Sequence, residues 1–473
     1  MKYRFKTKPT KYQKKAAVAA ARQGNIAFLM APGAGKTKAA IDAVCLQHLR
    51  GLCHRVAVLG PLDALGVWED ELEIHCPLPY AVDCDGDFTT ATGLMFQLMN
   101  YEKLSRRYRA SASKPYVYPY VNQIQAFNPD VIILDESHRC ARPSANRSQA
   151  LWRMVQRLRR VHGPRPYVYL LTGTPNATGY RALFSQFRIM DEDIFGTSVS
   201  DFDESFCVYG TGRRRFSVVS YKNKDILLEK IRTNSVIVPE SKVEGLPERT
   251  FQNVKTPLPH EAKQIYNELV EEYLAEHEDE VITGANAGAI RIRLLQLTGG
   301  FSPEGKLIHD AKLRALKSMC EDLYTFKEPV VVFCRHIKEV GACASVLRKI
   351  GFNTSMIYGA IPKDERMVAR RAFQAYDGKG APPAIVSQVR TGSLAITLTR
   401  GKEVIFYSLP DGFETYYQCY KRVHRKGQTR TVRIRHIVAP GTVDMKQLRT
   451  LREKSTWQAE LTGDPRGFLT GSG

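Results

Sequence analysis

The chain has 473 residues, of which 43% are apolar and 25% are charged, and this balance excludes a largely disordered protein. No stretch approaches the roughly 18 consecutive apolar residues of a membrane span, and the basic N-terminus is not followed by an apolar signal core. The net charge of +21 indicates a polyanionic partner. We therefore expect a nucleic-acid-binding protein that is cytoplasmic or nucleoid-associated, in the host cytoplasm if viral, with no membrane partner.

Short apolar or β-branched runs alternate with helical patterns along the chain. Runs with so little polar alternation are typical of buried parallel strands. In chain order they occupy residues 26–30, 56–59, 131–134, 167–171, 330–333, 353–358, 384–387, 404–408 and 432–438. The pattern predicts an α/β fold with two tandem parallel-sheet lobes.

The gap between the two sets of runs sets the expected domain boundaries. Residues from about 176 to 259 differ in character and become rich in proline, which indicates an insertion followed by a linker. We expect one lobe on either side of this linker, and a frayed, glycine-rich tail. The expected parts are lobe 1 at 1–240 with a helical insertion near 176–235, a linker at 241–260, lobe 2 at 261–455 and a flexible tail at 456–473.

A glycine-rich loop follows the first apolar run and opens an amphipathic stretch. The order of strand, glycine loop and helix is the one that holds a triphosphate, and its backbone N–H groups would surround the β-phosphate. Lys36 would place a cation between the β- and γ-phosphates, and the Thr37 hydroxyl would ligate Mg²⁺. The full pattern has glycine where this chain has Met30, so a glycine turn without a ligand is the alternative. The loop residues are Gly33, Ala34, Gly35, Lys36 and Thr37.

Two carboxylates follow the third apolar run. Open α/β sheets bind ligands at the carboxyl ends of their strands, and Asp135 and Glu136 lie at such an end. Asp135 would hold Mg²⁺ through water, and Glu136 would orient and deprotonate the attacking water. His138, two residues further on, is either a relay between the lobes or an ordinary satisfied polar residue.

Two weaker patterns lie beside other expected strands, one after a strand and one before the first strand. In Leu171-Thr172-Gly173-Thr174-Pro175, the hydroxyls of Thr172 and Thr174 would contact the carboxylates or His138. Near the N-terminus, Gln13 precedes the first strand at a distance suited to an amide contact with adenine, with an ordinary surface glutamine as the alternative.

The second lobe carries two further motifs. Thr391 and Gly392 follow an expected strand and suit either a phosphate-backbone contact or a link to the nucleotide. Gln418, Arg422 and Arg425 are spaced by four and three residues, so on a helix they would share one face. The two arginines would then reach the γ-phosphate from across a cleft.

Basic side chains gather in two runs beside these motifs. From 139 to 165 there are eight arginines and no acidic residue, and a second basic run begins at 421. We expect both runs to follow DNA phosphates, with a solvated surface as the alternative. Arg139, Arg142 and Arg147 are the candidate contacts in the first run.

Taken in order, these motifs resemble those of the superfamily-two helicases, and more narrowly of the Swi/Snf-type DNA translocases. The narrower resemblance rests on His424-Arg425-Lys426-Gly427-Gln428, similar to the His-Arg-Ile-Gly-Gln of that family, and it covers about residues 10 to 450. The chain departs from the family at 411–413, where Asp-Gly-Phe replaces Trp-Asn-Pro. It also reads Asp-Glu-Ser-His where the family's second motif ends in Ala-His or Gly-His.

The resemblance implies two RecA-like lobes that hydrolyse ATP with Mg²⁺ while tracking on double-stranded DNA. It gives Arg422 and Arg425 the role of arginine fingers, and places Gly392 and Gln418 near the nucleotide. Two alternatives stay open: a strand-separating helicase acting on forked or recombination DNA or on RNA, and a nucleotide-gated switch that recruits another protein. A replication or recombination partner is expected but not identified.

Overall fold

The structure is a computed structural model that describes residues 3–82, 93–108, 117–176, 178–211, 217–275, 284–392 and 397–463. The chain forms two compact units. Unit 1 comprises Met1–Val243 and Trp457–Pro465, and unit 2 comprises Glu244–Thr456 and Arg466–Gly473. In the described part of the chain, no helix is both long and apolar enough to cross a membrane.

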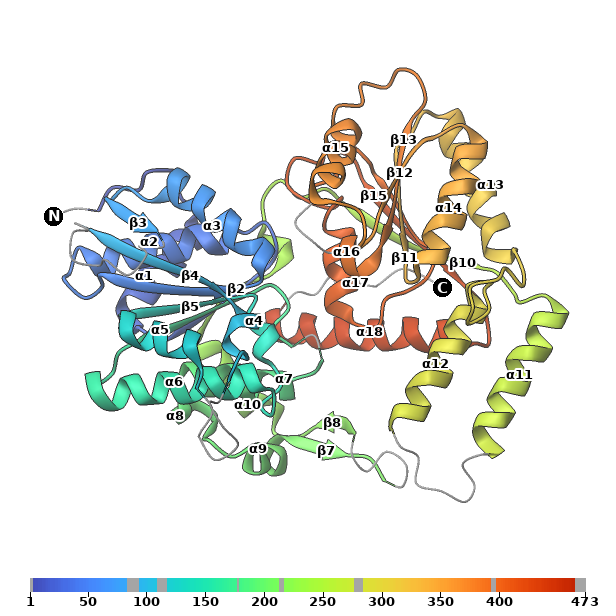
Figure 1. The fold of residues 1–473 in the computed structure, drawn as a ribbon. Helices are drawn as coiled ribbons and strands as arrows, with labels where there is room; N and C mark the ends of the chain where they lie inside the picture. Colours follow the sequence, from blue (N-terminus) through green and yellow to red (C-terminus); the bar gives the residue numbers. More distant parts are fainter. Residues whose placement is uncertain are drawn as a thin grey trace. The chain divides into compact units, whose positions relative to one another are not determined.

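Unit 1 is built on a seven-stranded sheet with the order β3-β4-β2-β5-β6-β1-β9, in which every pairing is parallel. Helices α1 to α3 cover one face and α4 to α6 cover the other (Figure 1). The strands are β1 (Ile26–Met30), β2 (Arg55–Gly60), β3 (Tyr80–Val82), β4 (Leu94–Asn100), β5 (Val131–Asp135), β6 (Tyr167–Thr172) and β9 (Ser235–Val238). The helices are α1 (Lys11–Gln23), α2 (Lys36–His48), α3 (Leu62–His75), α4 (Tyr101–Leu104), α5 (Pro119–Phe127) and α6 (Asn146–His162), with a 3₁₀ turn η1 (Ser137–Cys140).

The insertion in unit 1 follows β6 and is largely helical, as predicted. Its aromatic rings pack edge to face or tilted, with centroids such as those of Phe184 and Phe202 5.2 Å apart and those of Phe202 and Phe206 5.0 Å apart. A two-stranded antiparallel hairpin, which was not predicted, interrupts the helices. The elements are α7 (Arg181–Met190), α8 (Glu192–Phe195), α9 (Val199–Phe206), β7 (Cys207–Tyr209), β8 (Val218–Tyr221), α10 (Lys224–Thr233) and a second 3₁₀ turn η3 (Glu240–Lys242).

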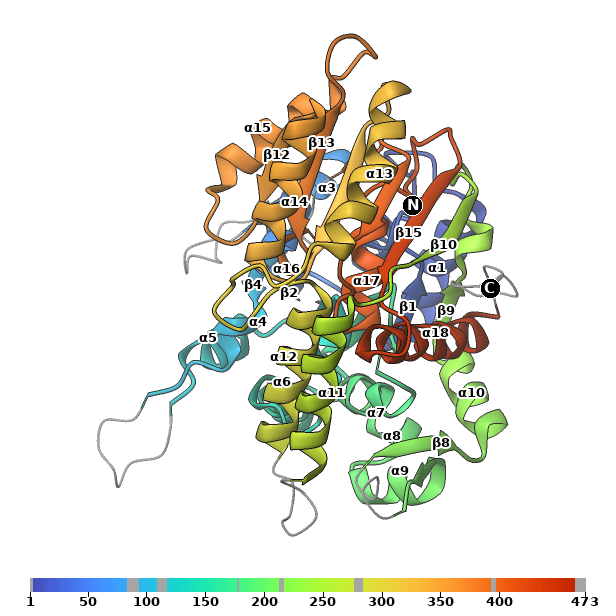
Figure 2. The same cartoon turned by 90° about the vertical axis from the view of Figure 1, so that its right-hand side faces the viewer.

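Unit 2 has a six-stranded sheet with the order β10-β15-β14-β11-β13-β12, again parallel throughout. Helices α13 and α14 lie on one face, and α15 to α17 lie on the other (Figure 2). The strands are β10 (Arg249–Lys255), β11 (Val330–Cys334), β12 (Asn353–Ile357), β13 (Pro383–Gln388), β14 (Glu403–Phe406) and β15 (Val432–Val438). The helices are α11 (His260–Ala275), α12 (Gly284–Thr298), α13 (Ala311–Thr325), α14 (Ile337–Ile350), α15 (Lys363–Gln374), α16 (Val389–Gly392), α17 (Phe413–Tyr420) and α18 (Val443–Thr462).

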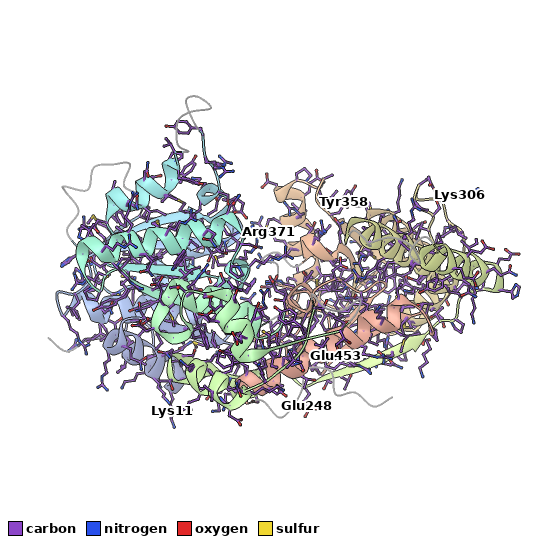
Figure 3. The ribbon with its side chains drawn as sticks, turned by 90° about the horizontal axis from the view of Figure 1, so that it is seen from below. Lys11, Glu248, Lys306, Tyr358, Arg371 and Glu453 are labelled. Carbon is purple, nitrogen blue, oxygen red and sulfur yellow. The ribbon has the colours of Figure 1, made fainter. Side chains whose placement is uncertain are left out.

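All nine predicted strands are present, and both lobes have the predicted parallel α/β architecture. The basic side chains responsible for the net charge are largely solvated. Lys11 and Lys306, for example, are exposed and lie at the outer edges of their units (Figure 3).

Two predicted boundaries differ from the structure. The segment predicted as a linker, 241–260, contains β10, which pairs in parallel with β15 along its whole length. The predicted flexible tail begins inside α18, whose last turns belong to unit 1. Helix α18 continues because Trp457 and Leu461, one turn apart, lie on the core of unit 1. Residues 464–473 lie outside the described part of the chain.

The end of α18 is held by specific contacts within unit 1. The ring of Trp457 lies edge-on to that of Tyr221, with centroids 5.8 Å apart. The Tyr180 hydroxyl donates to Glu460 Oε2 at 2.9 Å, and Leu461 is 0% exposed. This segment is therefore part of the core of unit 1.

Leu461→Ala tests that conclusion. We expect it to lower the free energy of unfolding of unit 1 by about 2–4 kcal/mol, because it removes a fully buried side chain and leaves a cavity. Urea unfolding followed by tryptophan fluorescence measures this directly, since Trp68, Trp152 and Trp457 all lie in unit 1. Leu62→Ala is the matched control; Leu62 is 68% exposed, so its loss should change stability by less than about 0.5 kcal/mol. Equal effects of the two substitutions would contradict the assignment.

Candidate nucleotide-binding site

The glycine loop joins the end of β1 to the start of α2. Gly33 and Gly35 have φ values of +82° and +77°, and Gly35 is the residue that caps α2. A Cβ on Gly35 would lie 2.2 Å from Gln13 Nε2, so both the backbone angle and the close approach require glycine here. The N-terminal N–H groups of α2 thus open onto the loop, as a phosphate site needs.

Gln13 supports this loop from α1. Its Oε1 accepts from Thr10 N at 2.9 Å, and its Nε2 donates to Ala34 O at 2.9 Å. The side chain is 9% exposed, so it is not an ordinary surface glutamine. In this structure both ends of the amide are engaged with the protein, and the predicted contact with adenine stays a prediction.

The carboxylates lie where β5 ends. Both oxygens of Asp135 accept hydrogen bonds, Oδ1 from Glu136 N at 3.0 Å and Oδ2 from Trp68 Nε1 at 3.0 Å. Burial, together with repulsion from Glu136, raises the pKa of Asp135 to about 6, while the Trp68 hydrogen bond and Lys36 oppose that shift. Glu136 follows with φ +51°, a conformation that is uncommon for a residue other than glycine.

His138 and Thr172 meet as predicted. His138 Nδ1 lies 3.0 Å from Thr172 Oγ1 and 3.4 Å from Glu136 Oε2. Thr174 contributes to the cluster through its backbone, since its N–H donates to Thr172 Oγ1 at 3.1 Å. The threonine turn and the carboxylate motif therefore form one hydrogen-bonded cluster.

Three residues that the sequence did not indicate also belong to this cluster. Trp68 contacts Asp135 as described above. Gln186 of α7 accepts from Ser137 Oγ at 2.8 Å and donates to Pro175 O at 2.9 Å, so it joins the two motifs. Gln458 of α18 donates to Gly173 O at 3.0 Å. Gln186 lies in an otherwise largely apolar helix, and this was the one available signal of a buried polar role.

The loop and the carboxylates together fit a magnesium–nucleotide complex. Thr37 and Asp135 offer the oxygen donors that Mg²⁺ prefers, and the half-buried Lys36 offers a cation beside the loop. Lys36 Nζ lies 3.4 Å from Met30 O, at the strand end that the loop follows. The predicted residues at positions 33–37 and 135–136 are thus placed at one edge of one sheet.

In unit 2, the predicted single helix through Gln418, Arg422 and Arg425 is wrong. Helix α17 ends at Tyr420, and Arg422 and Arg425 lie in the turns that follow. These turns include backbone hydrogen bonds between residues only three or two positions apart, such as Arg422 N to Cys419 O and Arg425 N to Val423 O. Gln418 Nε2 donates to Glu414 Oε1 at 3.1 Å, along the helix.

The segment that follows Thr391 and Gly392 along the chain packs against the arginine motif. Leu398 N donates to Arg422 O at 2.8 Å, and Arg425 NH1 donates to Thr397 Oγ1 at 3.2 Å. Thr391, in α16 beside Gly392, is only 6% exposed, so the structure does not present it for the predicted nucleic-acid contact. Residues 393–396 lie outside the described part of the chain.

Known proteins match this arrangement. The family described as helicase conserved C-terminal domain matches residues 311–427, which contain the arginine motif. The mouse "DNA annealing helicase and endonuclease ZRANB3" is 27% identical over 341 residues, covering 70% of this chain and 30% of that protein. The Arabidopsis thaliana "ISWI chromatin-remodeling complex ATPase CHR17" is 23% identical over 447 residues, covering 89% of this chain and 39% of that protein.

The chain is similar to Swi/Snf-type superfamily-two ATPases, and its residues 311–427 match the helicase conserved C-terminal domain. It spans about a third of the length of these relatives. Among solved structures, it is similar to the "Sulfolobus solfataricus SWI2/SNF2 ATPase core in complex with dsDNA", with 20% identity, a TM-score of 0.44, and coverage of 98% of this chain and 95% of that one.

The first basic run is divided in its roles. Arg139 and Arg142 are exposed and Arg147 is half-buried, which leaves them accessible. Arg159, by contrast, donates to Asn25 Oδ1 and to two backbone carbonyls, and Arg165 pairs with Asp130 at 3.2 Å. Arg159 and Arg165 therefore stabilise the fold, which corrects the expectation that the whole run follows DNA.

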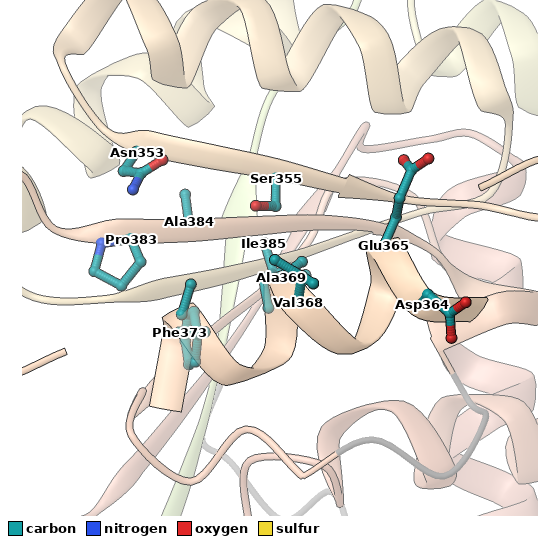
Figure 4. A pocket seen from close by; sticks show the side chains of 11 residues that line it. Asn353, Ser355, Asp364, Glu365, Val368, Ala369, Phe373, Pro383, Ala384 and Ile385 are labelled. Atoms are coloured by element: carbon teal, nitrogen blue, oxygen red, sulfur yellow. The ribbon is translucent and has the colours of Figure 1, made fainter. Parts of the chain in front are cut away.

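A pocket of 440 Å³ lies elsewhere, between α15 and the strands β12 and β13 of the unit 2 sheet (Figure 4). Its lining includes Ser355, Val368 and Phe373, and it is mainly apolar. The pocket contains none of the predicted site residues, so it is not the nucleotide site.

Two buried histidines support the arginine motif of unit 2. His424 Nε2 lies 2.8 Å from Pro247 O, and Nδ1 lies 2.8 Å from Lys421 Nζ. Burial and the nearby cations Lys421 and Arg249 lower the pKa of His424 to about 2. His436 lies 2.8 Å from the Tyr416 hydroxyl, and burial lowers its pKa to about 3. Both rings are therefore neutral in the folded protein at neutral pH.

These shifts predict a stability that depends on pH. The unfolded imidazole of His436 takes up a proton near its ordinary pKa of about 6.5, whereas the folded one does so only near 3. The contribution of each such histidine to stability should be constant above pH 6.5 and fall below it, by up to about 1.4 kcal/mol per pH unit. His436→Gln should make this slope shallower between pH 6.5 and 5 in scanning calorimetry, whatever its baseline cost. The exposed His162→Gln should leave the slope unchanged, and an unchanged slope in both variants would contradict the prediction.

Proposed function

We propose that this protein is an ATP-dependent motor that tracks along double-stranded DNA. The observation that carries the proposal is the convergence of the glycine loop, the two carboxylates and the threonine turn at one edge of the unit 1 sheet. Asp135 ends β5, Thr172 ends β6, and Lys36 begins α2, the helix that the loop joins to β1; these three strands are joined by parallel pairing. This arrangement suits phosphoryl transfer from a nucleoside triphosphate to water.

The side chains divide the chemistry between them. The loop N–H groups and Lys36 hold the phosphates, and Glu136 accepts the proton of the attacking water. Thr37 and Asp135 would hold Mg²⁺, which would supply neutralisation of the charge on the phosphates. The resemblance gives Arg422 and Arg425 the role of stabilising the charge that develops on the transferred group. His138 links Glu136 to Thr172, so a change at the γ-phosphate reaches the threonine turn.

The choice of DNA as the track rests on the net charge and on the similarity to proteins whose names describe an action on DNA or chromatin. A net charge of +21 and the exposed Arg139 and Arg142 suit a phosphate backbone. The relatives carry names that describe a DNA annealing helicase and chromatin-remodeling ATPases. We infer that Arg139, Arg142 and Arg147 contact phosphates without reading bases, so binding should be independent of sequence.

The division of roles in the nucleotide site can be tested with two substitutions. Lys36→Ala should weaken ATP binding, because it removes the cation between the β- and γ-phosphates. Glu136→Gln should keep binding and lose hydrolysis by at least about 10²-fold, because an amide positions water but does not accept its proton. Calorimetric binding and steady-state ATPase assays separate the two effects. Equal loss of ATP binding in both variants would contradict these roles.

The motor itself is tested by the dependence of turnover on the track. We expect double-stranded DNA to stimulate ATP hydrolysis strongly, and single-stranded DNA and RNA to do so weakly. With ATP, the protein should displace the third strand of a triplex and leave a forked duplex intact, while Glu136→Gln should do neither. Fork unwinding would indicate the strand-separating helicase. An ATPase rate that is the same with and without nucleic acid would instead indicate the nucleotide-gated switch.

A further inference from the structure

Trp68 is the buried contact between α3 and the carboxylate motif. Helix α3 is largely a surface helix, with Leu62, Val67 and Ile74 all exposed. Trp68 and Leu72, one turn apart, are the exceptions, at 1% and 0% exposure, and the Trp68 Nε1–H donates to Asp135 Oδ2 at 3.0 Å. A fully buried indole needs an acceptor for its N–H, and here the acceptor is the side chain expected to hold the metal.

The surroundings of Asp135 leave it little freedom. Glu136 N fixes the other carboxylate oxygen, and the Tyr101 hydroxyl donates to the Asp135 carbonyl at 2.8 Å. The carboxylate is therefore held from α3 on one side and from its own backbone on the other. Each oxygen keeps a second lone pair for a ligand.

We propose that Trp68 is a positioning residue for the magnesium–nucleotide site, whose indole N–H fixes the Asp135 carboxylate in the orientation that receives the metal. The proposal rests on the proposed function and deepens it. Groups that hold a metal ligand from behind set its orientation, and their loss typically weakens metal binding by about 10–100-fold. A tryptophan acting only in packing would affect folding without affecting the magnesium dependence of binding.

The chain offers a matched control in Trp152. This indole also donates to a carboxylate, Glu192 Oε1, but in the insertion and not beside the glycine loop. Trp68→Phe and Trp152→Phe both keep an aromatic ring and both remove one indole-to-carboxylate hydrogen bond. Only the first change affects the predicted metal ligand.

The experiment compares ADP binding with and without Mg²⁺ by titration calorimetry. We expect Trp68→Phe to weaken binding about tenfold when Mg²⁺ is present, and to leave metal-free ADP affinity within about twofold. Trp152→Phe should change neither affinity. A Trp68→Phe protein with the magnesium dependence of the wild type would overturn the proposal while leaving the proposed function intact. No magnesium-dependent binding by the wild type would overturn both.

If the Trp68→Phe protein fails to fold, a second measurement tests the proposal with Trp68 in place. In the Trp152→Phe, Trp457→Phe double variant, Trp68 is the sole tryptophan, since the chain has three. Its emission should change on addition of Mg²⁺ with ADP, and not on addition of ADP alone, because the metal engages the carboxylate to which the indole is bonded. The same Trp68 emission with ADP alone and with Mg²⁺ and ADP would overturn the proposal.

Discussion

The parallel pairing of β5, β6 and β1 is the constraint on which the nucleotide site depends. Asp135 lies opposite Leu171, and the next residue, Thr172, lies opposite Leu29. Because parallel strands end at the same edge of a sheet, three motifs that are far apart in sequence are brought together by backbone hydrogen bonds alone. Short local contacts, such as that of His138 with Thr172, then join side chains that the sheet has already aligned.

The sequence was informative where burial leaves a simple pattern. Strands such as β1, β5 and β11 are buried on both faces, so they read as apolar runs and were predicted, whereas the interior strand β4 was not. Strand β10 was not predicted either, because it is an edge strand whose exposed and half-buried residues resemble a linker. In the arginine motif, the spacing predicted one helix, but the chain leaves α17 at Tyr420, and His424 is bonded to the carbonyl of Pro247.

The parts of the site that escaped prediction are those that depend on tertiary contacts. The glycine loop and the carboxylates were found because each motif is contiguous. Trp68 lies 67 residues before Asp135, and only the adjacency of β2 and β5 brings α3 to the carboxylate. Gln13 was predicted to contact adenine, which stays a prediction; its observed partner is the Ala34 carbonyl of the loop, a contact that sequence spacing does not show.

Helix α18 has a consequence for how the protein is made. Unit 1 takes its final core residues from the end of the chain, after all of 244–456 has been translated. Domains generally fold as they emerge from the ribosome, from the N-terminus onward, but the first 243 residues emerge without the buried Leu461 and without the Gln458 contact to Gly173. During synthesis the threonine turn therefore lacks its contact with α18. Unit 1 reaches its complete fold only once unit 2 has been synthesised.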